Sequence, residues 1–339
     1  MTEPFVMPQA AWRATLAGKD LTDKMAPRLI SLSLTEKRGN EADMLEIVLD
    51  DRDGLLDIPA SGVKLRVFIG WVKGTGVPIG LIDKGEFLVD EACAAGPPDK
   101  ITIRARSANL TGAFALRRER SFVDKTVADV IGTIAGDNSL IARIDPDLAA
   151  KFISALGTGA KSDSVLLKEM GKTFDAVATV KAGYLIFSKI GKGATATGKT
   201  IPVDTIDRRQ TGPFNYTRAD RGQYDGVEAQ YHDKDSASRH TISAGHSGSG
   251  QLKRLRKVYA SAKAAQHAVD SELSRMKRGK AKMDFSLALG RPDYFPDRPI
   301  QVTGYKNAIN AHTWLIEEAT HEMNGTGGLV TRLRLEAKT

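Results

Sequence analysis

The amino-acid sequence predicts a mainly β protein, in which two similar antiparallel β-barrels flank a small mixed α/β insert and one long helix lies in the last third. Three observations predict this fold. Apolar and polar residues alternate in the first and last thirds, a helical apolar period appears in the middle, and the two β regions close with the same order of elements. The 339 residues are 41% hydrophobic and 27% charged, as in ordinary globular proteins.

The first third of the chain predicts five or six antiparallel strands. Strand-like alternation recurs in the segments 30–34, 45–49, 63–69, 86–91 and 101–105. A polar turn joins the first two of these segments, which predicts a hairpin. Many short strands separated by turns are typical of a small barrel or sandwich. We therefore expect a first β-barrel over residues 1–115.

The middle of the chain changes to a helical pattern. Apolar residues at helical spacing predict a helix over 124–135, with Asp124 as its N-cap, and a second helix over 163–173. Two short strands, 176–180 and 184–190, follow. These elements predict a mixed α/β insert over residues 116–195.

Alternation returns in the last third, which predicts the second β-barrel over residues 196–339. A long helix over 258–278 interrupts the strands, and we expect its apolar stripe to pack on this barrel. Each β region ends with a strand, a strand followed by an acidic pair, a Gly-containing turn and a last strand. The acidic pairs are Asp90 with Glu91, and Glu317 with Glu318. An internal duplication explains this likeness, and so does the general similarity of antiparallel barrels.

The charge and cysteine content limit the classes of function. Cys93 is the only cysteine, so an intrachain disulfide and a Cys-based zinc site are excluded, and we expect a reducing compartment. No signal peptide or membrane span is visible, which predicts no membrane anchoring. The net charge of +8 is scattered. Two basic clusters flank the long helix and are candidate partner-docking charges: Lys253, Arg254, Arg256 and Lys257, and then Arg275, Lys277 and Arg278.

A search for catalytic, nucleotide-binding and metal-binding motifs finds one match, and its surroundings do not fit. Gly193–Thr200 reads GATATGKT and matches the phosphate-binding loop pattern, but Pro202 and β-branched residues follow where a helix would have to begin. We therefore interpret it as a flexible loop. No histidine pair has the spacing of a helical zinc site, and no residues stand out as catalytic. The sequence predicts no catalytic, cofactor-binding or metal site.

One segment carries a family resemblance. The run DMLEIVLDDRDGLLDIPASGVKLRVFIGW, residues 43–71, resembles the signature of the phage late control protein D family, the baseplate hub of contractile phage tails. The signature positions are held by Asp43, Asp50, Asp53, Gly54, Pro59, Gly62, Gly70 and Trp71. Near the end, Gly290, Arg291, Pro292 and Asp293 resemble the family's Gly-Arg-Pro-Asp turn. The similarity extends over nearly the whole chain in the same segment order.

This resemblance implies two like barrels per subunit and a homotrimer, which is similar to the N-terminal hub part of type VI secretion spike proteins. It implies a structural protein of the virion tail, assembled in the host bacterial cytoplasm. Its expected partners are a trimeric tail spike, the sixfold tail tube and other baseplate proteins, with DNA only in transit through the axial channel. Two other functions stay open: a hub with peptidoglycan-degrading activity, for which the insert shows no distinctive acidic pair, and a DNA-binding late-gene regulator, for which no helix-turn-helix pattern is found.

Overall fold

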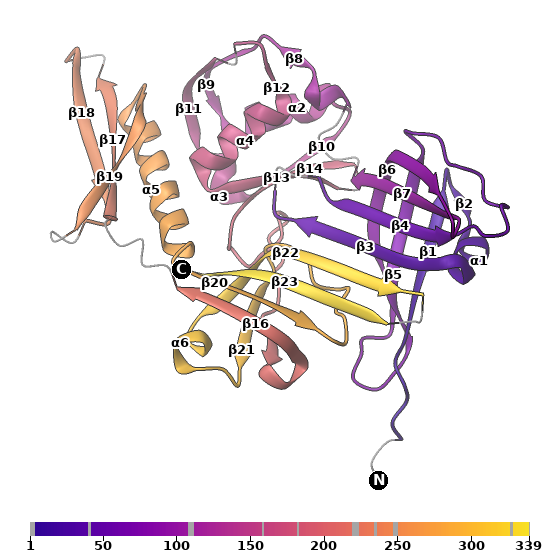
Figure 1. Cartoon of the computed structure of the whole chain (residues 1–339). Coiled ribbons are helices and arrows are strands. Elements are labelled where there is room, and N and C mark those ends of the chain that lie inside the picture. Colours follow the sequence, from indigo (N-terminus) through magenta and orange to yellow (C-terminus); the bar gives the residue numbers. More distant parts are fainter. Residues whose placement is uncertain are drawn as a thin grey trace.

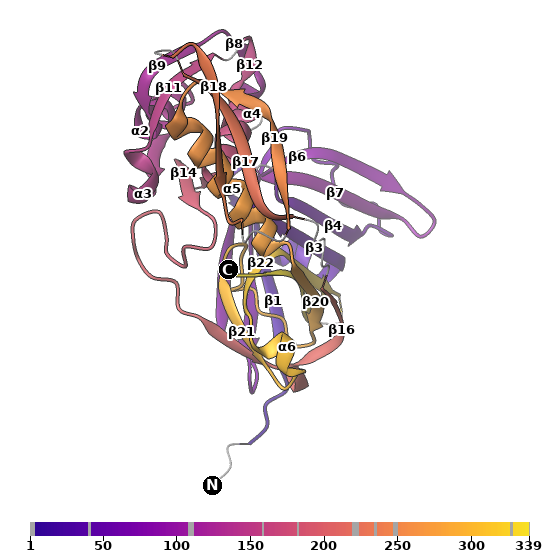
Figure 2. The same cartoon turned by 90° about the vertical axis from the view of Figure 1, so that its left-hand side faces the viewer.

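The structure is a computed structural model that describes residues 4–39, 42–107, 112–157, 159–181, 183–218, 224–233, 236–246, 250–325 and 328–338. Its main element is one 13-stranded, mostly antiparallel sheet, formed by the first and last thirds of the chain (Figure 1). A mixed α/β insert and a three-stranded sheet with a long helix lie beside it (Figure 2). The chain is therefore mainly β, with the mixed insert and long helix that the sequence predicts.

Seven strands form the first half of the large sheet: β1 (Gln9–Leu16), β2 (Lys19–Asp20), β3 (Leu29–Lys37), β4 (Met44–Asp50), β5 (Lys64–Lys73), β6 (Gly80–Ala95) and β7 (Lys100–Ser107). Their spatial order is β3-β4-β7-β6-β5-β1-β2. Trp12 on β1 and Leu34 on β3 stand near opposite ends of this order, yet both enter the same buried core. The half therefore curls around its core. The short helices α1 (Thr22–Met25) and η1 (Ala26–Arg28) connect β2 to β3.

Six strands form the second half: β15 (Asp204–Asp207), β16 (Thr211–Arg218), β20 (Ala281–Leu287), β21 (Pro299–Thr303), β22 (Thr313–Asn324) and β23 (Leu329–Ala337). The turns η3 (Arg208–Gln210) and α6 (Asn307–Asn310) belong to it. A separate core surrounds Tyr294 and Trp314. The order β16-β20-β23-β22-β21 repeats the order β3-β4-β7-β6-β5 of the first half.

The likeness of the halves extends to single backbone hydrogen bonds. In β6 a bulge lies between Val89 and Glu91, and in β22 a bulge lies between Ile316 and Glu318, at the two acidic pairs. The Gly62 amide donates to Val89 O at 2.7 Å, and the Asp297 amide donates to Ile316 O at 2.8 Å. Because β-bulges are specific local features, their matching positions favour an internal duplication over general barrel similarity.

The insert has a core of its own. Its elements are η2 (Gly112–Ala115), β8 (Arg117–Arg118), β9 (Ser121–Thr126), α2 (Val127–Asp137), β10 (Ile141–Ile144), α3 (Pro146–Ala149), β11 (Phe152–Gly157), β12 (Lys161–Ser162), α4 (Asp163–Phe174), β13 (Ala176–Lys181) and β14 (Tyr184–Lys189). The predicted N-cap Asp124 was wrong, because it lies within β9. Thr126 is the N-cap of α2, and its hydroxyl and the Asp129 carboxylate form a capping box.

The long helix α5 (Ala262–Arg278) also differs from its prediction. It begins at Ala262 rather than at 258, because Val258 belongs to a strand and Ser261 caps the helix. Beside α5 lies a small three-stranded sheet, formed by β17 (Tyr224–Asp233), β18 (Ser238–Ala244) and β19 (Gln251–Tyr259). The apolar stripe of α5 packs on this small sheet around Val227 and Val269, not on the second half of the large sheet. Its opposite side contacts α4 of the insert.

Candidate functional site: the seam between the two halves

The two halves of the large sheet are joined by antiparallel pairing of β3 with β22. The paired residues run from Lys37 opposite Glu318 to Ser31 opposite Asn324. On the outer face, the hydroxyls of Thr35 and Thr320 lie 3.2 Å apart. Strands far apart in sequence thus make one continuous sheet across the molecule. We call this pairing and the polar side chains beneath it the seam.

Three buried titratable side chains lie beneath the seam. The Lys84 ammonium donates to Glu36 Oε2 at 2.5 Å and lies 3.1 Å from His321 Nε2. His321 Nδ1 lies 2.9 Å from the Thr331 hydroxyl, which fixes the ring from its other side. These residues come from β3, β6, β22 and β23, so the contact holds both halves. The cost of burying these charges is offset, because the ammonium and the carboxylate each have an oppositely charged partner within hydrogen-bond distance.

The electrostatics of this cluster favour the Lys84–Glu36 ion pair and a neutral histidine. Burial alone would raise the pKa of Glu36, but Lys84 and His321 outweigh burial and lower that pKa to about 2. Burial lowers the pKa of His321, and the positive charge of Lys84 lowers it further. The chemistry of the cluster is therefore that of a structural ion pair.

A second contact across the seam joins the two signature segments. The Trp71 indole N–H donates to the carbonyl of Gly290 at 2.9 Å, although 219 positions separate these residues. A side chain at position 290 would lie 2.7 Å from Leu329 Cγ, so the close approach requires glycine. The next residue, Arg291, pairs with Asp293 and Asp204 at 2.8 and 2.7 Å. Pro292 is buried beside them.

A third contact ties all parts of the chain together. Arg38 Nη2 lies 2.6 Å from Glu336 Oε1, and Arg278 Nε lies 3.1 Å from the same oxygen. Arg278 also binds both carboxylate oxygens of Asp175. Asp297 accepts the Gly191 amide at 3.0 Å, and burial raises the pKa of Asp297 to about 6 while Arg38 opposes the rise. One buried ionic cluster therefore links both halves, the insert and α5.

The other signature residues shape turns of the first half. Asp43 accepts the Lys37 amide at 3.0 Å, and burial, followed by the negative charge of Glu36, raises the pKa of Asp43 to about 6. Asp53 pairs with Arg28 in the turn after β4. The further members of the signature in this half are placed as follows: Asp50 pairs with Arg52, Gly54 and Gly62 have positive φ, Pro59 lies between them, and Gly70 packs on the Gly80 carbonyl.

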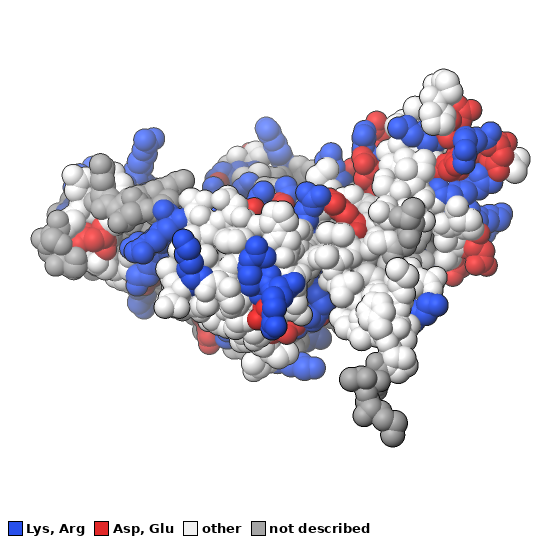
Figure 3. All heavy atoms as spheres, turned by 60° about the horizontal axis from the view of Figure 1, so that its bottom comes forward, with Lys and Arg blue, Asp and Glu red and all other residues white. Residues whose placement is uncertain are grey.

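The candidate docking charges are distributed unevenly. Lys253 and Arg275 both pair with Glu272, at 2.5 and 2.6 Å, and Arg254 pairs with Glu228 at 2.5 Å. Arg278 is buried in the cluster described above, so it has no surface to offer a partner, and its assignment as a docking charge was wrong. Arg254 is exposed but paired, and the other exposed members are Arg256, Lys257 and Lys277. Figure 3 shows Lys and Arg spread over one face, with acidic side chains between them.

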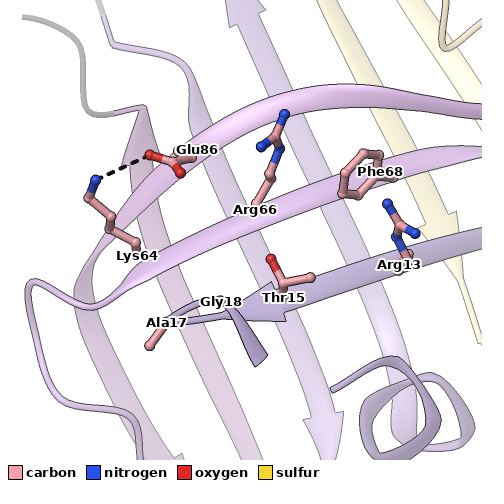
Figure 4. A pocket seen from close by; sticks show the side chains of 8 residues that line it. All are labelled: Arg13, Thr15, Ala17, Gly18, Lys64, Arg66, Phe68 and Glu86. Carbon is pink, nitrogen blue, oxygen red and sulfur yellow. Dashed lines mark ion pairs between the residues drawn. The ribbon is translucent and has the colours of Figure 1, made fainter. Parts of the chain in front are cut away.

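A shallow hollow lies on the outer face of β1 and β5 (Figure 4). It is lined by Arg13, Thr15, Ala17, Gly18, Lys64, Arg66, Phe68 and Glu86. The Arg13 guanidinium lies 4.0 Å above the Phe68 ring, and Lys64 pairs with Glu86 at 3.4 Å. The lining lacks a nucleophile with an adjacent base, so this hollow offers no catalytic arrangement.

The GATATGKT segment lacks the geometry of a phosphate-binding loop. Its amides are used inside the loop: the Thr195 amide donates to Lys199 O at 2.8 Å, and the Gly198 amide donates to Thr195 O at 2.8 Å. The segment leads into strand β15 rather than into a helix. Within the described ranges, no cluster of three or more His, Cys, Asp or Glu side chains could hold a metal ion. No helix of the described chain is long and apolar enough to cross a membrane.

Sequence reasoning missed the buried polar residues of the seam. A signal for one of them was present, since Glu36 continues the inward-facing series of Leu32 and Leu34 on β3. A carboxylate at such a position requires a buried cation. The partner, Lys84, comes from another strand, and the pairing of β3 with β22 that adds His321 is a long-range contact that periodicity cannot reveal.

Comparisons with known proteins add independent information. No protein-family model matches the chain. The probable baseplate hub protein of Escherichia phage 186 is 35% identical, with 97% of this chain and 93% of that protein covered. The probable baseplate hub protein of Escherichia phage P2 is 34% identical, with 95% and 92% covered.

Solved structures share the fold at low sequence identity. A tail protein from Neisseria meningitidis MC58 has a TM-score of 0.70 at 13% identity, with 97% of this chain and 96% of that chain covered. An E. coli component of the type VI secretion system, described as structurally similar to T4 bacteriophage tail proteins, has a TM-score of 0.58 at 9% identity, with 92% and 74% covered. The architecture of this chain is thus that of phage tail and type VI secretion proteins.

Proposed function

This chain belongs to the family of phage baseplate hub proteins, and from that premise we propose that three copies form the hub of a contractile tail. In this proposal the hub joins the sixfold tail tube to a trimeric central spike and surrounds the axial channel. The relatives in phages 186 and P2 are named as probable baseplate hub proteins, which is a structural role.

The observation that carries the proposal is the repeat of strand order in the two halves. Three copies of a chain with two like halves present six similar units around one axis. Such a ring can match a sixfold tube on one side while it keeps threefold symmetry for a spike. A chain with a single barrel would need six copies to do the same.

The seam supports a mechanical role. Its buried ion pairs and the Trp71–Gly290 hydrogen bond are directional, so they fix how the halves are oriented as well as hold them together. A hub that transmits force between tube and spike needs such a fixed geometry. In this proposal the seam is what keeps the two halves of a subunit at a constant angle during contraction.

We propose that the outer face of the joined sheet lines the channel. Its basic side chains stand beside acidic neighbours: Arg104 is 2.8 Å from Glu46, Arg106 is 2.9 Å from Asp90, and Arg332 is 3.2 Å from Glu322. Paired cations attract phosphates less than free ones. DNA in transit would therefore pass such a wall without being held.

We propose no catalytic activity for this chain, and a location in the virion tail after assembly in the host bacterial cytoplasm. The alternative of a peptidoglycan-degrading hub requires an acidic pair in a cleft. In the insert, Asp163 forms an ion pair with Arg120 at 3.3 Å, and Asp145 forms an ion pair with Lys192 at 2.5 Å. Both carboxylates are therefore structural.

Cryo-electron microscopy of the tail particle that carries this chain tests the proposal. We expect three copies in one ring between the tube and the spike, and particles without a spike when the chain is deleted. A chain with an internal tag, inserted in the exposed turn 52–54 and shown to support assembly, locates the ring. One or six copies at this level, or complete baseplates without the chain, would overturn it.

A further inference from the structure

The open strand edges of the large sheet include those of β16 and β6. The strand path of the sheet ends at β16, which pairs only with β20 among the described strands. On the other side, β6 pairs with β5 only as far as Leu88, and the amide and carbonyl of Val89 bond to residues 62 and 63. Beyond it, residues 91–95 of β6 have β7 on one edge and no strand of the described chain on the other. Such edges are templates for another strand.

The internal repeat assigns each of these two edges an equivalent that is already paired. Glu91 and Glu318 follow the matching bulges and stand opposite Arg104 and Arg334. This register makes Cys93 the equivalent of Thr320, two residues further along each strand. The open edge of β6 is therefore the equivalent of the edge of β22 that pairs with β3.

The same register relates β16 to β3. Glu46 on β4 stands opposite Arg104, and Asp284 on β20 stands opposite Arg334. Opposite these two acidic residues lie Ser33 on β3 and Asn215 on β16, as shown by the pairing of each hairpin. Two residues further along, Thr217 on β16 is the equivalent of Thr35 on β3.

We propose that β16 of one copy pairs with β6 of the next copy, in the register in which β3 pairs with β22 inside one copy. Thr217 then lies opposite Cys93 of the neighbouring copy, as Thr35 lies opposite Thr320. The pairing cannot form within one chain, because six strands separate β16 from β6 in the sheet. At about 4.8 Å per strand, the two edges lie roughly 34 Å apart along the sheet.

The side chains at both edges fit this pairing. Phe214 is 41% exposed on β16, whereas its equivalent Leu32 on β3 is 1% exposed, so a neighbouring copy would cover an apolar residue that is now open. The edge of β6 carries Ala92, Cys93, Ala94 and Ala95, which are small and uncharged. Edge strands that must stay unpaired are guarded by charges or proline. This edge has no such guard between residues 92 and 95.

The pairing is head to tail, and it closes into a ring. The contact between copies repeats the contact between halves, so each half is rotated relative to the half before it by nearly the same angle. A closed ring results when a whole number of these rotations adds up to a full turn. The closure into three copies rests on the proposed hub function. The strand pairing itself rests on the two registers and is tested separately.

The native cysteine provides a direct test. In Thr217→Cys the new thiol faces Cys93 of the next copy across paired strands, a separation that a disulfide can bridge. We expect mild oxidation of assembled particles to give covalent dimers and trimers on a non-reducing gel, and the unchanged chain to give neither. Thr217→Cys combined with Cys93→Ser should give none. Asn215→Cys, which lies two residues away on the same face, should cross-link much less than Thr217→Cys.

An internal control separates a wrong pairing from poor reactivity. Thr35→Cys with Thr320→Cys, in a Cys93→Ser background, should close a disulfide within one chain at the equivalent position. If this control closes and Thr217→Cys stays monomeric in assembled particles, the proposed pairing is wrong. If particles contain three copies but only Asn215→Cys cross-links, the register is wrong and the hub function stands. A copy number other than three would instead overturn the hub function.

Discussion

Trp12 and Trp71 are both buried in the first core, but their indole N–H groups differ. Trp71 donates to Gly290 O at 2.9 Å, whereas the Trp12 N–H is buried with no hydrogen-bond partner among the described residues. A buried donor without an acceptor already costs folding free energy, and removal of a made bond leaves a buried acceptor unpaired. The two residues therefore form a natural pair for comparison.

We expect Trp71→Phe to lower the free energy of unfolding more than Trp12→Phe. Both changes remove similar apolar volume, but Trp71→Phe also leaves the buried Gly290 carbonyl without its donor, which costs about 1–3 kcal/mol. Urea unfolding followed by circular dichroism measures both. Equal losses for the two variants would show that the bond across the seam contributes nothing.

Asp43 gives a pH dependence with a defined sign. Burial raises its pKa to about 6 in the folded protein, above the 3.8 of an ordinary aspartate. Because the folded state then holds the proton more tightly, this group destabilises the fold progressively as the pH rises from about 4 to 6, and the cost remains at pH 7. Asp43→Asn removes the charge and retains an oxygen for the Lys37 amide.

We therefore expect Asp43→Asn to raise the free energy of unfolding at pH 7.5 by on the order of 1–2 kcal/mol, since two pKa units correspond to at most about 3 kcal/mol. At pH 4 the two proteins should differ little. Denaturant unfolding at both pH values measures the effect. Glu36→Gln serves as a contrast. The pKa of Glu36 in the folded protein is about 2, below that of an ordinary glutamate, so the ion pair of Glu36 stabilises the fold above pH 4.5. We therefore expect Glu36→Gln to lower the free energy of unfolding at pH 7.5. A pH-independent effect of Asp43→Asn would contradict this account.

Among the elements, the strands of the large sheet follow the sequence closely, and the α5 region does not. Strict alternation predicts β3, β4, β5 and β7, because one face of each is buried against a core. In contrast, β19 reads QLKRLRKVY, in which charges hide the strand pattern. Its two faces are both partly exposed on a small sheet, so the sequence shows no clean alternation there.

The same reasoning explains what sequence could reveal of the candidate site. The signature residues 43–71 and 290–293 are visible as motifs, but their meeting at Trp71 and Gly290 depends on the pairing of β3 with β22. That pairing joins strands about 285 positions apart, as the contact between Thr35 and Thr320 shows. Local patterns hold no information on such contacts. The matching order of elements and the matching acidic pairs were the local traces of the repeat that creates the seam.

The packing of α5 predicts a local loss of stability. Leu273 packs against the small sheet, close to Gly245 at the end of β18. Leu273→Ala should therefore cost about 2 kcal/mol, near the low end for buried leucines because this side chain is only partly buried. We expect hydrogen exchange to accelerate in β17 and β18 more than in β20 and β23. The control Lys263→Ala, on the exposed start of the same helix, should leave exchange unchanged.

The same variant distinguishes the two packing arrangements. If α5 packed on the second half of the large sheet, Leu273→Ala would expose amides of β20 and β23 first. The structure shows only a small contact of α5 with β23, near the buried Arg278. A uniform increase of exchange throughout the chain would indicate that the small sheet and the large sheet unfold together.

For the whole molecule, the arrangement of charge decides which surfaces can guide assembly. Glu228 and Glu272 pair with three of the basic residues on β19 and α5, namely Lys253, Arg254 and Arg275. Of the rest, Arg256, Lys257 and Lys277 are exposed with no ion pair in the described part of the chain. Free charges steer the approach of a partner with an opposite surface, whereas paired charges contribute little. We propose that these three residues meet acidic surfaces of neighbouring baseplate or tube subunits.

Reversal of the three charges, Arg256→Glu, Lys257→Glu and Lys277→Glu, should slow the joining of hub and tail at low salt and leave the melting temperature of the isolated chain unchanged. The defect should shrink as salt is added, because screening over about 10 Å at 0.1 M weakens the repulsion that the glutamates introduce. Counts of complete tails by negative-stain electron microscopy at two salt concentrations measure it. Arg254→Glu is the matched control, since it breaks a local ion pair with Glu228 and should lower stability without a salt-dependent assembly defect. If the triple variant assembles normally but its particles release DNA faster, the three side chains line the channel, and the docking assignment is wrong.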